Sequence, residues 1–143
     1  MMTEHAKAIL EKMRSSEYPE LNFDFVFKLT NESERGAILV GASKVETYLE
    51  NLILKILPSK QKSYTSRLLN YPGPLSSFSG KIELLYAFGV IDKKLYDSLT
   101  ILRKIRNDAA HSNEEFSIQK IKDTIDKIYD LNTVFSKQYI PNL

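Results

Sequence analysis

The residues best suited to chemistry are charged or polar side chains that helical spacing places beside apolar ones. At about 100° per residue, the helix that starts at Asp92 carries an inward apolar stripe of Leu95, Leu99, Leu102, Ile105 and Ala109. Arg106 falls within this stripe, between Leu102 and Ala109. A guanidinium stays charged, and removing it from water without a partner costs several kcal/mol. We therefore expect a carboxylate or a carbonyl group to meet Arg106 inside the fold.

A second pair of charged residues starts another helix. Glu34 and Arg35 continue the apolar stripe that begins at Ile38, so both should face inward from the first turn. The simplest arrangement has the two helices facing each other, with Glu34 pairing with Arg106 or with Arg35. This pairing is a hypothesis.

His111 lies on the same helix as Arg106. It follows Asn107 by four residues and Arg103 by eight, so the three share one flank. It also lies near a helix C-terminus, where the dipole favours imidazolium. His111 alone is either a simple helix cap or part of a larger cluster with the charged and polar residues named above. That cluster is either a buried polar network or a functional site, and these interpretations stay open.

The segments that position these residues have helical period. Apolar spacing predicts helices at residues 4–14, at 21–29, from Asn31 to Pro58, from Ser76 or Ser77 to about Phe88, from Asp92, and from Ser117. Residues 21–29 also alternate like a strand, but a single strand would have no partner. We predict an all-α, antiparallel multi-helix bundle that forms one domain over residues 1–143.

Local signals mark where these helices begin and end. Asn31 with Glu34 three residues later resembles a capping box, and Ser76 or Ser77 and Asp92 are suitable N-caps. Gly89 fits the end of the helix that begins after Ser77. Residues 59–70 are expected to be a basic loop.

Composition excludes several kinds of site. The 143 residues are 43% apolar and 27% charged, a globular balance, and they include no cysteine and only two histidines. Disulfides and thiolate chemistry are therefore excluded, and no metal or other cofactor is expected. The charged N-terminus and the absence of about 18 consecutive apolar residues predict a cytoplasmic protein without a membrane partner.

Positive charge is concentrated in one stretch, although the net charge is only +2. No acidic residue occurs between Glu50 and Glu83, where the basic residues are Lys55, Lys60, Lys62, Arg67 and Lys81. The stretch is either a basic surface patch or a solvated loop with uneven charge.

Several segments together resemble the mannitol operon repressor family of bacterial regulators. In order, they are Glu34–Ala37 (ERGA), Gly73–Ser79 (GPLSSFS), Lys81–Ile82, Tyr86–Ile91 (YAFGVI) and Ile101–His111 (ILRKIRNDAAH), within residues 30–118. The resemblance implies an all-helical transcriptional regulator with no established DNA-binding motif. The chain departs from the family pattern at Asp108-Ala109, where an acidic residue and then an aromatic one are usual. It also has Gly80-Lys81 where a small residue and then arginine are usual.

The run from Arg106 to His111 also resembles the motif of HEPN (higher eukaryote and prokaryote nucleotide-binding) proteins. In that class, arginine and histidine four to six residues apart form a metal-independent ribonuclease site where two protomers meet. The resemblance implies that Arg106 stabilises phosphorane charge, His111 moves the proton and Asn107 orients them.

Three functions follow. The first is a regulator that acts through protein partners, as a homodimer and without catalysis. The second is a HEPN-like ribonuclease using Arg106 and His111, which would make RNA the favoured nucleic acid. The third is a helix-turn-helix DNA binder over Leu84–Leu99, which is disfavoured because Asp92 and Asp97 would face phosphates.

Overall fold

The part of the chain that the structure describes is built from helices. The computed structural model describes residues 23–131. Along them run α2 (Phe23–Leu29), α3 (Glu34–Ile56), α4 (Lys62–Leu69), α5 (Phe78–Ala87), α6 (Lys93–His111), the 3-10 helix η1 (Ile118–Ile121) and α7 (Lys122–Leu131). This part contains no strand, so the predicted all-α class is confirmed. The helix expected at residues 4–14 lies outside the described residues.

The longest helix, α3, begins and ends at residues suited to those places. Ser33 is the N-cap, and its hydroxyl accepts a hydrogen bond from the Gly36 N–H at 3.0 Å. The prediction that Asn31 caps this helix is wrong, because Glu34 is its first residue and not its third. Pro58 ends the helix as predicted: Leu57 before it is extended.

α5 and α6 form a helical hairpin with the caps that the sequence predicts. The Ser77 hydroxyl accepts a hydrogen bond from Gly80 N at 3.0 Å, and Asp92 Oδ1 accepts one from Leu95 N at 2.8 Å. Gly89 has a φ of 68°, a left-handed conformation that favours glycine. The chain can therefore reverse direction directly after α5.

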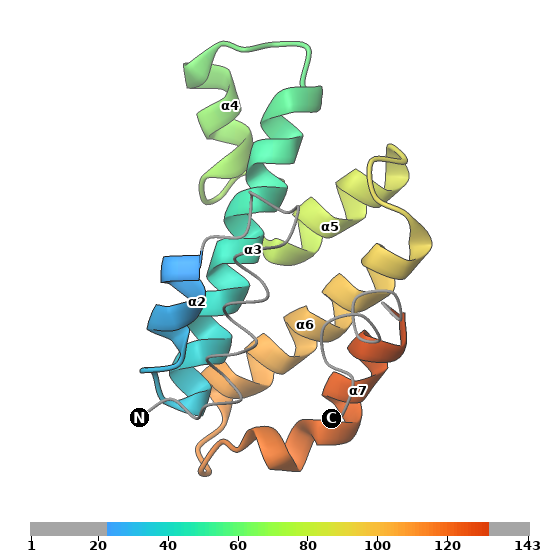
Figure 1. The fold of residues 1–143 in the computed structure, drawn as a ribbon. Helices are drawn as coiled ribbons and strands as arrows, with labels where there is room; N and C mark the ends of the chain where they lie inside the picture. The colour runs from blue at the N-terminus through green and yellow to red at the C-terminus, as the bar shows by residue number, and fades with distance from the viewer. Residues whose placement is uncertain (1–22, 132–143) are drawn as a thin grey trace.

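The core lies where α3, α5 and α6 meet. Each of these helices contacts the other two, and α7 also contacts α6. Figure 1 shows α6 running back between α5 and α7 to the start of α3. One cluster of buried apolar side chains joins the core helices: Ala42, Leu49, Ile53, Leu69, Phe78, Ile82, Leu85, Ile91 and Leu99.

The inward stripe predicted for α6 is correct except at its start. Leu99, Ile105 and Ala109 are buried as expected. Leu95 is exposed instead, because it lies in the first turn of α6, at the outer end of the hairpin.

α4 was not predicted, because residues 59–70 were interpreted as a loop. Thr65 and Leu69, four residues apart, are the buried side chains of this short helix, and its other side is polar. Figure 1 shows α4 beside the C-terminal end of α3. The basic residues of this stretch therefore lie on a packed helix and its flanking turns.

Candidate functional site

Arg35 connects the first turn of α3 to the last turn of α6. Its Nη1 donates to the Ala109 and Ser112 carbonyl oxygens at 2.9 and 3.0 Å, and its Nη2 donates to the Glu114 carbonyl at 2.8 Å. Carbonyls at a helix C-terminus have no partner within the helix, and a cation also interacts favourably with the dipole there. Arg35 is half-buried, in agreement with the inward direction predicted for it, but its partners are carbonyl groups and not Glu34. Glu34 is exposed, so the prediction that it also faces inward is wrong.

Glu34 binds the backbone at the far end of the segment 112–117, which links α6 to η1. Its Oε2 accepts a hydrogen bond from the Ile118 N–H at 2.8 Å, at the start of η1. Ser117, the N-cap of η1, makes no side-chain cap hydrogen bond, so the Glu34 carboxylate takes that place. We call the set formed by Glu34, Arg35 and residues 109–118 the α3–α6 junction.

The predicted pairing of Glu34 with Arg106 is wrong. The half-buried Arg106 donates from Nη1 to Asn107 Oδ1 at 3.2 Å, and it makes no ion pair with a carboxylate among residues 23–131. Because Arg106 keeps part of its contact with water, an amide oxygen is a sufficient partner. The acceptor that Arg106 has is the side-chain amide oxygen of the next residue on α6, and not a carboxylate or carbonyl group of a facing helix.

His111 and Asn107 share the wall of an open cleft at the end of α6. The cleft has a volume of about 430 Å³ and is lined by Asn107, Asp108, His111 and Ser112. We call it the α6 cleft. His111 is exposed, and Arg103 on the same flank of α6 is half-buried. The α6 cleft therefore presents an imidazole, a carboxylate, an amide and a hydroxyl group, which can bind a polar ligand or transfer a proton.

The α6 cleft and the α3–α6 junction share Ser112. The carbonyl of Ser112 accepts a hydrogen bond from Arg35, and Ser112 also lines the cleft. Arg35, Asn107 and His111 therefore lie together at the C-terminal end of α6. Glu34 binds at the other end of the segment 112–117, at Ile118.

Lys81 does not belong to the predicted basic patch. It is only 3% exposed, and its Nζ donates to Glu46 Oε1 at 2.9 Å and to the Ser76 carbonyl at 3.3 Å. Because Lys81 lies on the inner side of α5, its charge is neutralised by α3 and does not reach the surface. Glu46 lies 35 residues away along the chain, so no local pattern in the sequence points to it as the partner of Lys81.

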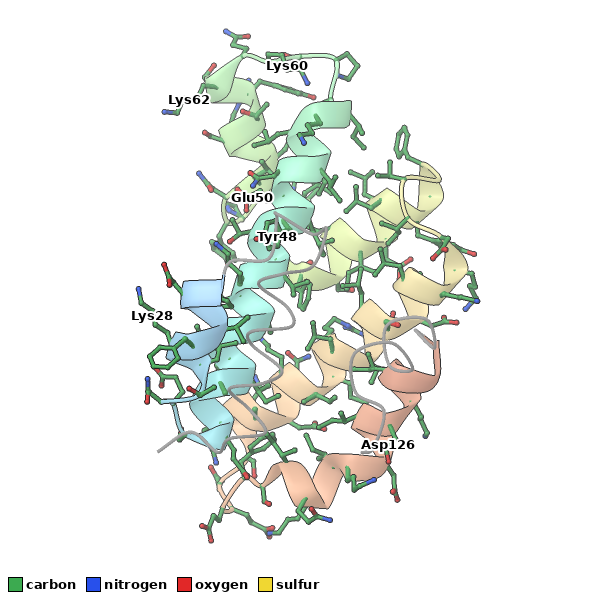
Figure 2. The ribbon with its side chains drawn as sticks, viewed as in Figure 1. Lys28, Tyr48, Glu50, Lys60, Lys62 and Asp126 are labelled. Atoms are coloured by element: carbon green, nitrogen blue, oxygen red, sulfur yellow. The ribbon has the colours of Figure 1, made fainter. Side chains whose placement is uncertain are left out.

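The other four basic residues of the patch are exposed. Lys55 is in the last turn of α3, Lys60 in the following loop, and Lys62 and Arg67 on α4. Figure 2 shows Lys60 and Lys62 at the far end of the α3–α4 pair, beyond Glu50.

Four exposed apolar side chains lie in and beside the turn between α5 and α6. Tyr86, Phe88, Val90 and Leu95 are 38, 71, 38 and 41% exposed. We call them the α5–α6 apolar cluster. This cluster was not predicted, although the sequence carries a signal for it: large apolar residues flank Gly89, where the helix ends and cannot bury them.

Among residues 23–131, three side chains in the first turns of α6 and α7 have shifted pKa values. The Tyr96 hydroxyl donates to Glu83 Oε1 at 2.8 Å, and this hydrogen bond raises the pKa of Tyr96 above its ordinary 10.0. Hydrogen bonds to Asp97 and Asp126 raise the pKa values of Lys93 and Lys122. The Tyr96 ring also stacks on Tyr86, with 4.4 Å between centroids.

Two further properties concern only residues 23–131. In that range, no three histidine or acidic side chains are close enough to hold one metal ion. None of the helices there is both long enough and apolar enough to cross a membrane.

The described residues form an all-helical structure whose candidate site lies where the start of α3 meets the end of α6. The chain belongs to the mannitol repressor family: residues 38–142 match the family described as "Mannitol repressor". The family resemblance stated from the sequence is confirmed, and membership supports a transcriptional-repressor-like role. Glu34 and Arg35 precede the matched range. Comparisons with curated proteins and with solved structures gave no match.

Proposed function

We propose that this chain is a repressor-family regulator that acts by binding a protein through the α5–α6 apolar cluster. The observation that carries the proposal is the exposure of four large apolar side chains within residues 86–95. Leaving such area in water costs about 25 cal/mol per Å², and apolar surface with a polar rim is typical of protein interfaces. Glu83, Lys93 and Asp97 provide the polar side chains around it.

Direct reading of DNA by α5 and α6 has less support. In a helix-turn-helix over Leu84–Leu99, the residue at Leu95 should be buried between the two helices, whereas Leu95 is exposed. α6 also packs against α3, α5 and α7, and Asp92 and Asp97 at its start would repel phosphates. These observations favour a protein partner.

A second copy of the chain is the first partner to test. A symmetric dimer uses the same surface on both subunits, so one apolar cluster is sufficient to form its centre. We expect size-exclusion chromatography with light scattering to give twice the chain mass of 16.4 kDa. Phe88→Ser should shift the protein towards the monomer. Phe27→Ser, a change of another exposed phenylalanine on α2, should leave the mass unchanged.

The regulatory role requires a test in cells. RNA sequencing of a deletion strain would identify the transcripts that rise when the protein is absent. Wild type and Phe27→Ser should restore repression, whereas Phe88→Ser should not, at equal protein levels and equal helical circular dichroism. Full repression by Phe88→Ser would contradict the proposal, whatever the oligomeric state.

One observation favours a second function, a metal-independent ribonuclease of the HEPN type. Arg106 is hydrogen-bonded to Asn107, and Asn107 lines the α6 cleft together with His111. In this proposal, Arg106 stabilises charge on the phosphorane, Asn107 orients Arg106, and His111 transfers the proton.

Cleavage of single-stranded RNA in EDTA tests this second function. His111→Ala should abolish cutting and leave the unfolding midpoint unchanged, because His111 is exposed. Lys104→Ala, a change of an exposed residue on the same helix, should cut at the wild-type rate. Equal cutting by wild type and His111→Ala would identify a contaminating nuclease and exclude this site.

A further inference from the structure

One end of the molecule carries positive charge without acidic residues. We call it the basic arm: the last turn of α3, α4 and the turn at residues 70–74. Between Glu50 and Glu83 the chain contains no aspartate or glutamate. With Lys81 buried against Glu46, the charged side chains that remain exposed there are Lys55, Lys60, Lys62 and Arg67.

The basic side chains of the arm differ in whether they already have hydrogen-bond partners within the protein. Lys60 donates to the carbonyls of Leu54 and Lys55, so it caps α3 and its charge offsets the helix dipole. Lys62 and Arg67 are exposed on α4, and neither forms an ion pair with a carboxylate among residues 23–131. These two cations are therefore available to an anion from solution.

Two tyrosines on the arm present their rings to solvent. Tyr64 is exposed on α4, and the Arg67 guanidinium lies 5.6 Å from its ring centroid. Tyr71 is 92% exposed, in the turn that follows α4. Backbone hydrogen bonds from Gly73 N to Asn70 O, at 2.6 Å, and from Leu75 N to Leu68 O, at 2.9 Å, fix that turn against α4. The Tyr71 ring is thus held in water by an ordered backbone.

We propose that the basic arm binds single-stranded nucleic acid without sequence preference. Phosphates would interact with Lys62 and Arg67, and unpaired bases would stack on Tyr64 and Tyr71. Cations that follow a backbone, together with aromatic rings that accept bases, are the combination that recognises single strands. A duplex offers less to the arm, because its bases are already stacked on each other.

Other anionic ligands fit the arm less well. An anionic membrane would need an apolar face to insert, whereas the solvent-facing side of α4 carries Lys62, Ser63 and Arg67, with Tyr64 as its one aromatic ring. An acidic protein would pair with the cations but would leave Tyr71 unused. The arm also lies about 30 Å from the α3–α6 junction, since Arg35 and Lys55 are separated by 20 residues of helix at about 1.5 Å each. It is therefore separate from the α6 cleft. The apolar cluster of the proposed function lies at the other end of α5 from the turn at residues 70–74.

Fluorescence anisotropy with labelled 20-nucleotide strands of RNA and of DNA tests the proposal. Contacts of Lys62 and Arg67 with two phosphates should lower the affinity about sevenfold between 50 and 200 mM salt. Lys62→Glu and Arg67→Glu should each weaken binding at least tenfold. Lys127→Glu, the same charge change at an exposed position on α7, should have no effect. Equal affinity for RNA and DNA would show that the arm recognises phosphates and bases alone. Tighter binding of RNA would show that it also contacts the 2′-hydroxyl group.

Stacking requires its own variants. Loss of one stacked base should weaken binding about 5- to 150-fold in Tyr71→Ser, while Tyr71→Phe should keep wild-type affinity. Tyr71 is almost fully exposed, so neither change should affect folding. No saturable binding at 50 mM salt would overturn the proposal. So would equal weakening by Lys62→Glu and Lys127→Glu, or binding to anionic phospholipid vesicles in preference to single strands.

Discussion

Arg35 should contribute more to stability than any other charged side chain at the α3–α6 junction, and Arg35→Met tests this. The methionine keeps an unbranched apolar stem but donates no hydrogen bond. Wild type has three charge-assisted bonds from Arg35, and the two to Ala109 and Ser112 are partly buried. Such bonds contribute about 1.5–3 kcal/mol each. Taking the lower value for the two partly buried bonds, and neglecting the exposed third, we expect a loss of about 3 kcal/mol.

Urea unfolding followed by circular dichroism measures this loss. With a slope of about 1.5 kcal/mol per molar urea, the midpoint should fall by about 2 M. Lys104→Met, at an exposed position on α6, should change the stability by less than about 0.5 kcal/mol. Arg35→Lys should fall between the two, since one ammonium group cannot reach all three carbonyls. A free energy of unfolding for Arg35→Met within about 0.5 kcal/mol of wild type would refute this reasoning.

Three other changes have expected outcomes. Lys81→Met should destabilise the fold by about 3 kcal/mol, because it leaves the Glu46 carboxylate partly buried without its cation, and Lys81→Arg should recover most of the loss in urea unfolding. Gly73→Ala should cost at least about 2 kcal/mol in the same assay, because a Cβ there would collide with backbone carbonyl oxygens at the end of α4. The hydrogen bond to Glu83 raises the pKa of Tyr96, so its stabilising effect should be complete below pH 10.0 and be lost as the pH rises through the folded-state pKa. Absorbance titration of tyrosinate should show this, and Glu83→Leu should move the Tyr96 titration down towards 10.0, whereas an unchanged curve would contradict it.

The features predicted correctly are those that depend on neighbours in the sequence. Ser77, Asp92 and Gly89 act within three or four residues of themselves, so the residue type alone indicates the cap or the turn. The inward stripe of α6 also follows from spacing. Helical periodicity gives the direction of each side chain, and in a bundle direction largely decides burial.

The features predicted wrongly depend on the identity of a distant partner. The Arg35 acceptors lie 74 to 79 residues away and are backbone carbonyls, which every residue has and which give no sequence signal. Lys81 and Glu46 are each ordinary surface residue types, and only the packing of α5 on α3 brings them together. α4 was missed for a different reason: a helix with two buried side chains has too few apolar positions to show a period.

The predicted pairing of Glu34 with Arg106 is replaced in the structure by contacts of Arg35 and Glu34 with backbone groups, and this changes the physical basis of the candidate site. A buried ion pair would have joined α3 and α6 through two side chains on their facing surfaces. Arg35 instead binds the backbone where α6 ends, and Glu34 binds the backbone where η1 begins, so both ends of the 112–117 connection are fixed by consecutive residues. Because Ser112 is both an acceptor for Arg35 and part of the α6 cleft, the wall of the cleft depends on the first turn of α3. Arg35 therefore holds part of the cleft wall in place, although it does not itself line the cleft.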